Sequence, residues 1–213
     1  MFRDRREAGK RLAAELSHLR AEDVLVLALP RGGVPVAYEV AQALRAPLDL
    51  VMVRKIGAPD QPELAVAAVV DGESPEIVEN QELLDMLGLD RSWVERAAER
   101  ELREIARRRE HYLEGRPPLE MAGRTVVLVD DGIATGASFR AALRATRRRG
   151  PAHLVLAVPV APPDTLAALR AEADETVCLE TPRAFGAVGA FYEDFHQTSD
   201  EEVVELVARA AAQ

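Results

Sequence analysis

The stretch 126–138 constrains the fold more than any other part of the chain. It reads Val-Val-Leu-Val-Asp-Asp-Gly-Ile-Ala-Thr-Gly-Ala-Ser, and an apolar pattern typical of a helix follows it. A strand that leads through small residues into a helix points several backbone N–H groups at one place, and with the helix dipole these suit a phosphate. Asp130 and Asp131 would repel that phosphate unless they face a sugar diol or a Mg²⁺ ion carried by the ligand. The sequence therefore predicts a ribose phosphate site.

Strands and helices are expected to alternate along the chain, because the hydrophobic period switches repeatedly between the two kinds of element. We expect strands at 24–29, 48–53, 65–70, 125–130, 153–159 and 176–179, and helices at 5–19, 34–45, 91–113, 138–149, 163–172 and 201–211. This order predicts an α/β fold with a mostly parallel, doubly wound sheet and helices on both faces. Ligands of such sheets bind at the carboxyl ends of the strands.

Two more segments follow strands at that predicted edge. Arg31, Gly32 and Gly33 come after the strand at 24–29. Paired glycines let the backbone approach a ligand closely, and the arginine supplies a forked donor for phosphate oxygens. Lys55 follows the strand at 48–53 and is one of two lysines in a chain with 25 arginines. We expect it to point at the ligand phosphates, with an ordinary surface charge as the alternative.

The motif at 126–138 resembles the signature of the type I phosphoribosyltransferases, which use 5-phosphoribosyl 1-pyrophosphate (PRPP). That signature has four hydrophobic residues, two acids, a three-residue spacer and Thr-Gly-x-Ser/Thr, and every position is filled here. The alternative is a generic strand–loop–helix turn in which the two aspartates are capping or surface residues. The resemblance covers about residues 20–160 and implies the family's α/β fold.

The resemblance also implies roles for individual residues. Asp130 and Asp131 would hold the ribose hydroxyls, in part through the Mg²⁺ that PRPP brings. Pyrophosphate would be bound by Arg31, Gly32, Gly33 and Lys55, in a loop that often contains a cis peptide bond in this family. The 5′-phosphate would be bound by Ile133, Ala134, Thr135, Gly136, Ala137 and Ser138.

One position departs from part of the family. Members that use hypoxanthine or guanine usually carry an acid just before the Thr-Gly pair, where this chain has Ala134. Members of the adenine type also have alanine there, so catalysis is not excluded. The departure puts an oxopurine acceptor in doubt.

The segment at about 57–123 reads as a helical or flexible-loop insertion within a single domain that spans 1–213. In phosphoribosyltransferases this region carries a mobile loop that closes over PRPP. The helix expected at 91–113 has a narrow apolar stripe, formed by Trp93, Ala97, Leu102, Ile105 and Tyr112. We interpret it as a lid or a dimer arm, because so narrow a stripe buries little within one subunit. The alternative is a solvated helix that lies on the core.

The region at about 180–200 is rich in glycine and aromatic residues, although aromatic residues make up only 4% of the chain. Related enzymes build a small hood for the acceptor base from such a segment. One of Phe185, Phe191 and Tyr192 is expected to stack on the base. The alternative is that these rings cover one end of the sheet.

Composition excludes several other classes of protein. A net charge of −9 argues against general binding of nucleic acid, and no apolar run is long enough to span a membrane. Cys178 is the only cysteine, so no internal disulfide is expected, and residues 1–20 suggest an amphipathic helix rather than a secretory signal. These features favour a cytoplasmic protein. No Gly-x-Gly-x-x-Gly motif follows a strand, which argues against a dinucleotide oxidoreductase.

The expected activity is transfer of the phosphoribosyl group from PRPP to a nitrogenous base, with release of pyrophosphate and with magnesium as the metal. A homodimer is what the family resemblance implies. The alternative is a regulator of nucleotide metabolism that binds PRPP or a nucleotide without turnover. Release of pyrophosphate would separate these two hypotheses.

Overall fold

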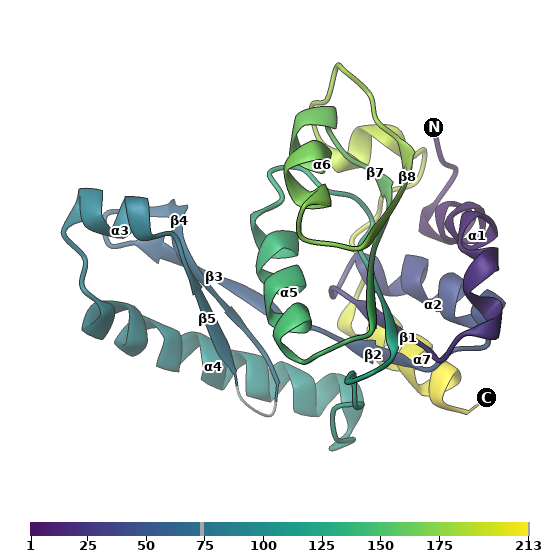
Figure 1. Ribbon diagram of the computed structural model, residues 1–213, viewed down its shortest axis with the longest axis horizontal. Coiled ribbons are helices and arrows are strands. Elements are labelled where there is room, and N and C mark those ends of the chain that lie inside the picture. The colour runs from purple at the N-terminus through teal and green to yellow at the C-terminus, as the bar shows by residue number, and fades with distance from the viewer. Residues whose placement is uncertain (73–74, 213) are drawn as a thin grey trace.

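A five-stranded parallel sheet forms the core of the computed structural model, which describes residues 1–72 and 75–212 (Figure 1). Its strands are β1 (Val24–Ala28), β2 (Leu48–Leu50), β6 (Thr125–Val129), β7 (His153–Val160) and β8 (Glu175–Glu180). Their order in the sheet is β2-β1-β6-β7-β8, and each neighbouring pair is parallel. The predicted α/β class with a mostly parallel sheet is confirmed.

Helices cover both faces of this sheet (Figure 1). One face carries α1 (Arg5–Glu15), α2 (Gly33–Leu44) and α7 (Asp200–Ala211), and the other carries α5 (Ala137–Arg148) and α6 (Pro163–Arg170). Because side chains alternate along a strand, Val26 and Ala28 pack into the first layer while Leu25 and Leu27 pack into the second. Strands buried on both faces read as continuous aliphatic runs, which is why the sequence revealed them. Short 3₁₀ helices lie at Ser17–Ala21 and Val188–Phe191.

A second, antiparallel sheet extends from the core as an arm (Figure 1). It contains β3 (Val53–Ala58), β4 (Gln61–Val70) and β5 (Glu76–Glu79), and it is followed by α3 (Gln81–Leu87) and α4 (Arg91–Leu113). The predicted strand at 48–53 is therefore wrong, because β2 ends at Leu50 and β3 starts the arm at Val53. The Asp71 carboxylate accepts a hydrogen bond from the Met52 backbone N–H at 2.8 Å, at the junction between the two sheets.

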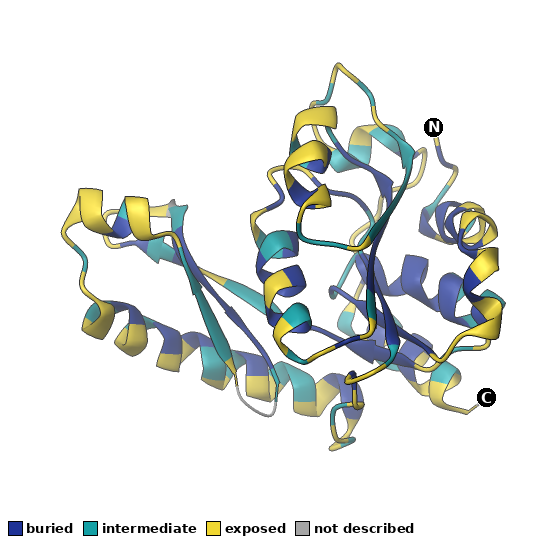
Figure 2. Cartoon of the chain, viewed as in Figure 1, coloured by how far each residue is buried: buried dark blue, intermediate teal, exposed yellow. Residues whose placement is uncertain are grey.

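Helix α4 has the predicted bounds, and the chain covers its apolar stripe only in part, because Ile105 and Tyr112 are buried while Trp93, Ala97 and Leu102 are half-buried. Its buried side chains include Val94, Ala98 and Ile105, and they face the arm sheet while the opposite side of the helix is exposed (Figure 2). Arg54 of β3 donates to the buried Glu101 carboxylate at 2.9 Å, which adds a polar contact to this packing. The arm sheet covers part of the stripe within one subunit, so the narrow stripe alone does not require a partner subunit, and the lid or dimer arm stays a prediction. Among the described helices, none is long and apolar enough to cross a membrane.

A buried ion cluster fastens the arm to the parallel sheet. The Arg109 guanidinium of α4 donates to Asp71 Oδ2 at 2.6 Å and to Asp49 Oδ1 at 3.2 Å, and it also reaches the Leu50 carbonyl at 3.2 Å. Asp49 and Asp71 are only 3% and 4% exposed. Burial raises the pKa of Asp71, and the charge of Arg109 opposes that rise. One guanidinium therefore bridges two buried carboxylates where the arm leaves the core.

We expect Arg109→Met to lower the free energy of unfolding by about 3–5 kcal/mol, because it leaves two buried carboxylates without their cation. This loss of unfolding free energy should shrink as pH falls, since protonation of Asp71 removes the charge that the variant leaves buried and unpaired. Denaturant unfolding at pH 5 and pH 8 measures both effects. Arg103→Met, at an exposed position of the same helix, serves as the control, and an equal loss in the two variants would contradict this account.

Candidate functional site

Two loops meet at the carboxyl edge of the parallel sheet, one after β1 and one after β6. Ala28 lies opposite Val129 in the sheet, and the Leu29 N–H donates to the Val129 carbonyl at 3.0 Å, so both loops start at the same level. A Cβ on Gly32 would overlap the Asp131 carboxylate, and one on Gly33 would lie 2.9 Å from the Asp130 Cα. The glycines therefore permit the contact between the loops. The peptide bond between Pro30 and Arg31 is cis.

The two aspartates of the second loop sit in an environment that disfavours their charges. Asp130 Oδ1 accepts a hydrogen bond from the Asp131 N–H at 2.8 Å. Burial, together with the negative charge of Asp131, raises the pKa of Asp130 well above its ordinary value. Burial also raises the pKa of Asp131, and the nearby Arg5 opposes that rise. A pair of crowded carboxylates suits a ligand that brings a cation or hydroxyl donors.

Arg5 is a site residue that sequence reasoning missed. It is 8% exposed, and its Nε donates to Asp131 Oδ2 at 2.8 Å while its Nη1 donates to the His196 carbonyl at 2.6 Å. Its guanidinium also lies 3.9 Å from the centre of the Phe195 ring. One signal could have found it: Arg5 lies at i, i+3 and i+7 spacing with Ala8 and Leu12, on the apolar face of α1. A charge on that face needs a buried partner.

The candidate phosphate loop leads from Ile133 into α5. Gly136 has a φ of +78°, which glycine adopts without strain, and the helix starts at the next residue. Within the described chain, residues 134–136 donate no backbone hydrogen bond, so their N–H groups remain available for an anion. Ile133 differs, because its N–H donates to the Val160 carbonyl at 2.9 Å. The expectation that the Ile133 backbone N–H binds the phosphate is therefore wrong.

The two predicted phosphate-binding cations lie in different places. Arg31 is in the loop after β1, and its Nη1 lies 3.4 Å from Asp200 Oδ1 at the start of α7. The Tyr112 hydroxyl of α4 donates to the same oxygen at 2.6 Å, and burial with the Asp200 charge raises the pKa of Tyr112 to about 12. Asp200 thus connects Arg31 to helix α4.

Lys55 is not at the edge of the parallel sheet, so that part of the prediction is wrong. It lies within β3 opposite Ala68, is exposed, and lines a cavity of about 480 Å³ between the arm and α5. Ala137 and Arg140 form part of the opposite wall, so the cavity borders the end of the candidate phosphate loop. Lys55 therefore lies near the candidate phosphate loop because both border the start of α5, and not because they share an edge of one sheet.

The aromatic residues of the hood form a small core of their own. Tyr192 is 6% exposed, its ring lies 5.3 Å from that of Phe2, and its hydroxyl donates to the Asp131 carbonyl at 2.6 Å. Phe185 and Phe191 stack on each other with ring centres 5.3 Å apart, and both remain half-buried. The Tyr192 ring is therefore unavailable for stacking on a base, and its hydroxyl supports the aspartate loop instead.

The hood also holds the N-terminus of the chain. The Phe2 N–H donates to the Phe191 carbonyl at 2.8 Å, and the Glu193 N–H donates to the Phe2 carbonyl at 2.8 Å. Val188 lies directly against Gly132, because a Cβ on that glycine would come within 2.6 Å of the Val188 Cγ1 atom. The hood therefore packs on the aspartate loop and fixes the segment that carries Arg5.

Comparison with known proteins agrees with this geometry. A family model described as "Phosphoribosyl transferase domain" matches residues 4–196. Two Mycobacterium tuberculosis proteins, from strains CDC 1551 and H37Rv and each named "Putative phosphoribosyl transferase", are 48% identical over 210 residues. These matches cover 99% of this chain but 47% of each relative, so the chain spans about half the length of the curated relatives it matches.

Solved structures show the same fold. A crystal structure of TT1426 from Thermus thermophilus has a TM-score of 0.86 and 47% sequence identity, and the match covers 98% of both chains. A structure of a hypothetical protein from Neisseria gonorrhoeae with bound ppGpp has a TM-score of 0.51 and 14% identity, with 98% of both chains covered. At that identity the second likeness supports the fold alone.

The raised pKa of Asp130 predicts a gain in stability on Asp130→Asn. The folded protein holds a proton on Asp130 at pH values where the unfolded chain has lost it, so stability falls as pH rises above about 4. Asparagine cannot ionise, and its oxygen can still accept the bond from the Asp131 N–H. The variant should therefore unfold at a higher temperature at pH 7, by an amount that shrinks toward pH 4.

Thermal unfolding between pH 4 and pH 8 measures this difference. Asp60→Asn, at an exposed aspartate in the β3–β4 turn, is the matched control and should change the midpoint little at any pH. A variant at Asp130 that is less stable than the unsubstituted protein across the whole range would contradict the assignment.

Proposed function

The chain belongs to the phosphoribosyl transferase domain family, and on that premise we propose that it transfers the 5-phosphoribosyl group of PRPP to a nitrogenous base and releases pyrophosphate. The observation that carries this proposal is the contact between Gly32 and Gly33 of one loop and Asp130 and Asp131 of the next. This contact supports the proposal because it joins the Arg31 loop to the loop that carries two carboxylates and leads into residues 134–136, whose N–H groups donate no backbone hydrogen bond in the described chain.

Each part of PRPP has a proposed partner at this edge. The N–H groups of residues 134–138 bind the 5′-phosphate, with the hydroxyls of Thr135 and Ser138 as further donors. Asp130 and Asp131 accept hydrogen bonds from the ribose 2′- and 3′-hydroxyls. Arg31 and the N–H groups of Gly32 and Gly33 bind the pyrophosphate.

These contacts favour breakage of the bond between C1′ and pyrophosphate. The bond loosens to an oxocarbenium-like centre, the pyrophosphate leaves with the bonding electrons, and a nitrogen of the base attacks from the opposite face. The two carboxylates would lie beside the ribose. Once the cation and the hydroxyl donors of the ligand offset the crowding that raises their pKa values, their negative charge stabilises the positive charge that develops on the ring. Mg²⁺ bound by PRPP would offset the charge of the leaving group, and the crowded carboxylates fit a metal that arrives with the ligand.

The acceptor is a planar base that lies beneath the hood. Phe185 and Phe191 keep partial exposure, whereas the more exposed Phe195 ring already faces the Arg5 guanidinium, so one of the first two is the proposed stacking surface. Ala134 supplies no acid to pair with the base, which disfavours hypoxanthine and guanine as acceptors.

Release of pyrophosphate from PRPP tests the proposed activity. We expect turnover with Mg²⁺ and one member of a panel of purines, pyrimidines and simple amines. The double substitution Asp130→Asn/Asp131→Asn should lower kcat/KM by at least about 100-fold, because it removes the charges that face the ribose. Asp60→Asn should keep full activity. Calorimetric binding of PRPP without turnover on any acceptor would instead support a nucleotide-binding regulator.

Lys55 provides a separate test of where pyrophosphate binds, because Lys10 is the only other lysine and is an exposed residue of α1. Limited acetylation followed by peptide mass spectrometry gives the reactivity of both amines in one sample. With saturating Mg²⁺ and PRPP, we expect Lys55 to become several-fold less reactive while Lys10 stays unchanged, since an ammonium held by phosphate has no free electron pair with which to attack the reagent. Equal reactivity of Lys55 with and without PRPP would remove it from the ligand site.

A further inference from the structure

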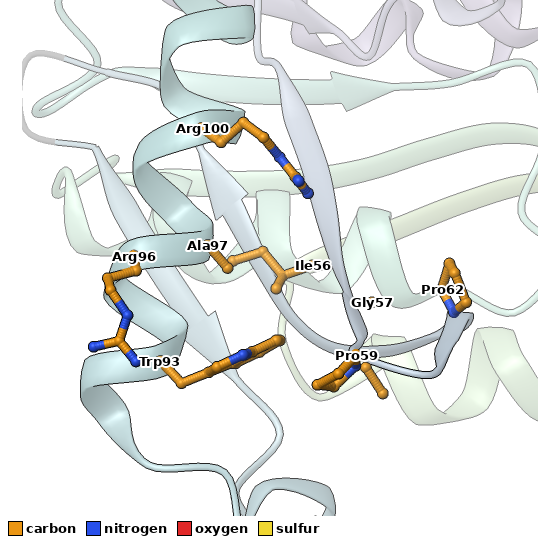
Figure 3. Close-up of a pocket in the computed structure, with 9 residues that line it drawn as sticks. Ile56, Gly57, Pro59, Pro62, Trp93, Arg96, Ala97 and Arg100 are labelled. Carbon is orange, nitrogen blue, oxygen red and sulfur yellow. The ribbon is translucent and has the colours of Figure 1, made fainter.

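A second cavity lies in the arm, away from the loops that form the candidate active site. It has a volume of about 540 Å³ and opens between the β3–β4 hairpin and the first turns of α4 (Figure 3). Ile56, Pro59 and Pro62 line one side, and Trp93, Arg96 and Arg100 line the other. Its volume falls within the range of small-molecule sites. None of its lining residues belongs to the loops at 30–33 or 130–138.

The walls of this cavity suit a flat apolar group. Trp93 extends from α4 toward Pro59 at the hairpin, so that an indole ring and a pyrrolidine ring face the same space (Figure 3). Ile56 is buried and lies next to Ala97 of the helix, and both residues line the cavity (Figure 3). Aromatic rings bind planar ligands by stacking, which combines burial of apolar area with a preferred orientation.

The charges of the cavity suit an anion. Arg96 and Arg100 lie one turn apart on α4, and no carboxylate is among the described residues that line the cavity. Arg96 donates to the neutral Ser92 hydroxyl at 3.0 Å. Arg100 donates to Glu101 at 3.2 Å, but the Glu101 carboxylate is shared with Arg54 at 2.9 Å. The Asp90 carboxylate lies near enough to Arg96 for their charges to interact, so three guanidinium groups share two carboxylates, which leaves a surplus of one positive charge.

We propose that this cavity binds a planar aromatic carboxylate. The ring lies between Trp93 and Pro59. The guanidinium groups of Arg96 and Arg100 point apart in Figure 3, and in the proposed complex these two exposed side chains turn toward the cavity, where their forked N–H donors match the two oxygens of the carboxylate. The site is independent of the proposed phosphoribosyl transfer, because no group assigned to PRPP contributes to it.

Trp93 is the only tryptophan of the chain, so its fluorescence reports on this cavity directly. The probe is 4-nitrobenzoate, a planar aromatic anion that quenches indole fluorescence, and the neutral analogue 4-nitrobenzamide is its matched control. We expect 4-nitrobenzoate to quench the fluorescence saturably. We expect 4-nitrobenzamide to bind at least about tenfold more weakly, because it lacks the charge that the arginines bind.

Substitutions on the exposed surface of α4 complete the test. Arg96→Gln/Arg100→Gln should weaken binding of 4-nitrobenzoate at least about tenfold, whereas Arg103→Gln, an exposed arginine that does not line the cavity, should leave it unchanged. Circular dichroism and the unfolding midpoint verify that both variants are folded. The proposal is overturned by quenching that stays linear in probe concentration, by equal affinity for acid and amide, or by an unaffected double variant. Competition by saturating PRPP would also overturn it, because the probe would then lie in the candidate active site.

Discussion

Gly32 and Gly33 pack directly against Asp131 and Asp130 at the carboxyl edge of the parallel sheet, and the candidate site depends on that contact. The register of β1 and β6 brings the two loops to one level, and the missing side chains of Gly32 and Gly33 let them touch. Any larger residue would separate the loop that offers Arg31 from the loop that offers Asp131. The chemistry of the site thus begins with a steric condition that only glycine meets.

The same contact crowds negative charge, and other parts of the chain offset it. Arg5 approaches Asp131 from the N-terminal helix, and Tyr192 donates to the carbonyl of the same residue from the hood. Both elements are joined by the backbone bonds between Phe2 and residues 191–193. The N-terminus and the hood therefore act as one support for a single aspartate. Burial and the charge of Asp131 raise the pKa of Asp130 well above its ordinary value, whereas Arg5, which pairs directly with Asp131, opposes the rise that burial causes there.

The sequence predicted the parts of the molecule whose chemistry is local. The aliphatic run of β6, the acids after it and the small residues before α5 are contiguous, so strand, loop and helix could be assigned together. A strand at 65–70 and the helix at 91–113 were predicted in the arm, but its antiparallel sheet was missed. Strand β3 contains the charged residues Arg54 and Lys55, and the Arg54 partner Glu101 lies on α4, distant in sequence. Arg5 and Tyr192 were missed or misassigned for the same reason, since each acts on Asp131 across more than 60 residues.

Helix α4 connects the arm to the candidate site through two polar contacts one turn apart. Arg109 binds the carboxylates at the base of the arm, and Tyr112 binds Asp200, which also faces Arg31. A buried ion cluster permits little displacement, so the end of α4 near the core is fixed together with the loop that is proposed to bind pyrophosphate. The start of α4, at Trp93, instead borders a cavity and has exposed arginines around it. Any movement of the arm over a bound ligand should therefore bend the part of α4 that precedes Arg109 in the chain, while the contacts of Arg31 and Tyr112 with Asp200 stay in place.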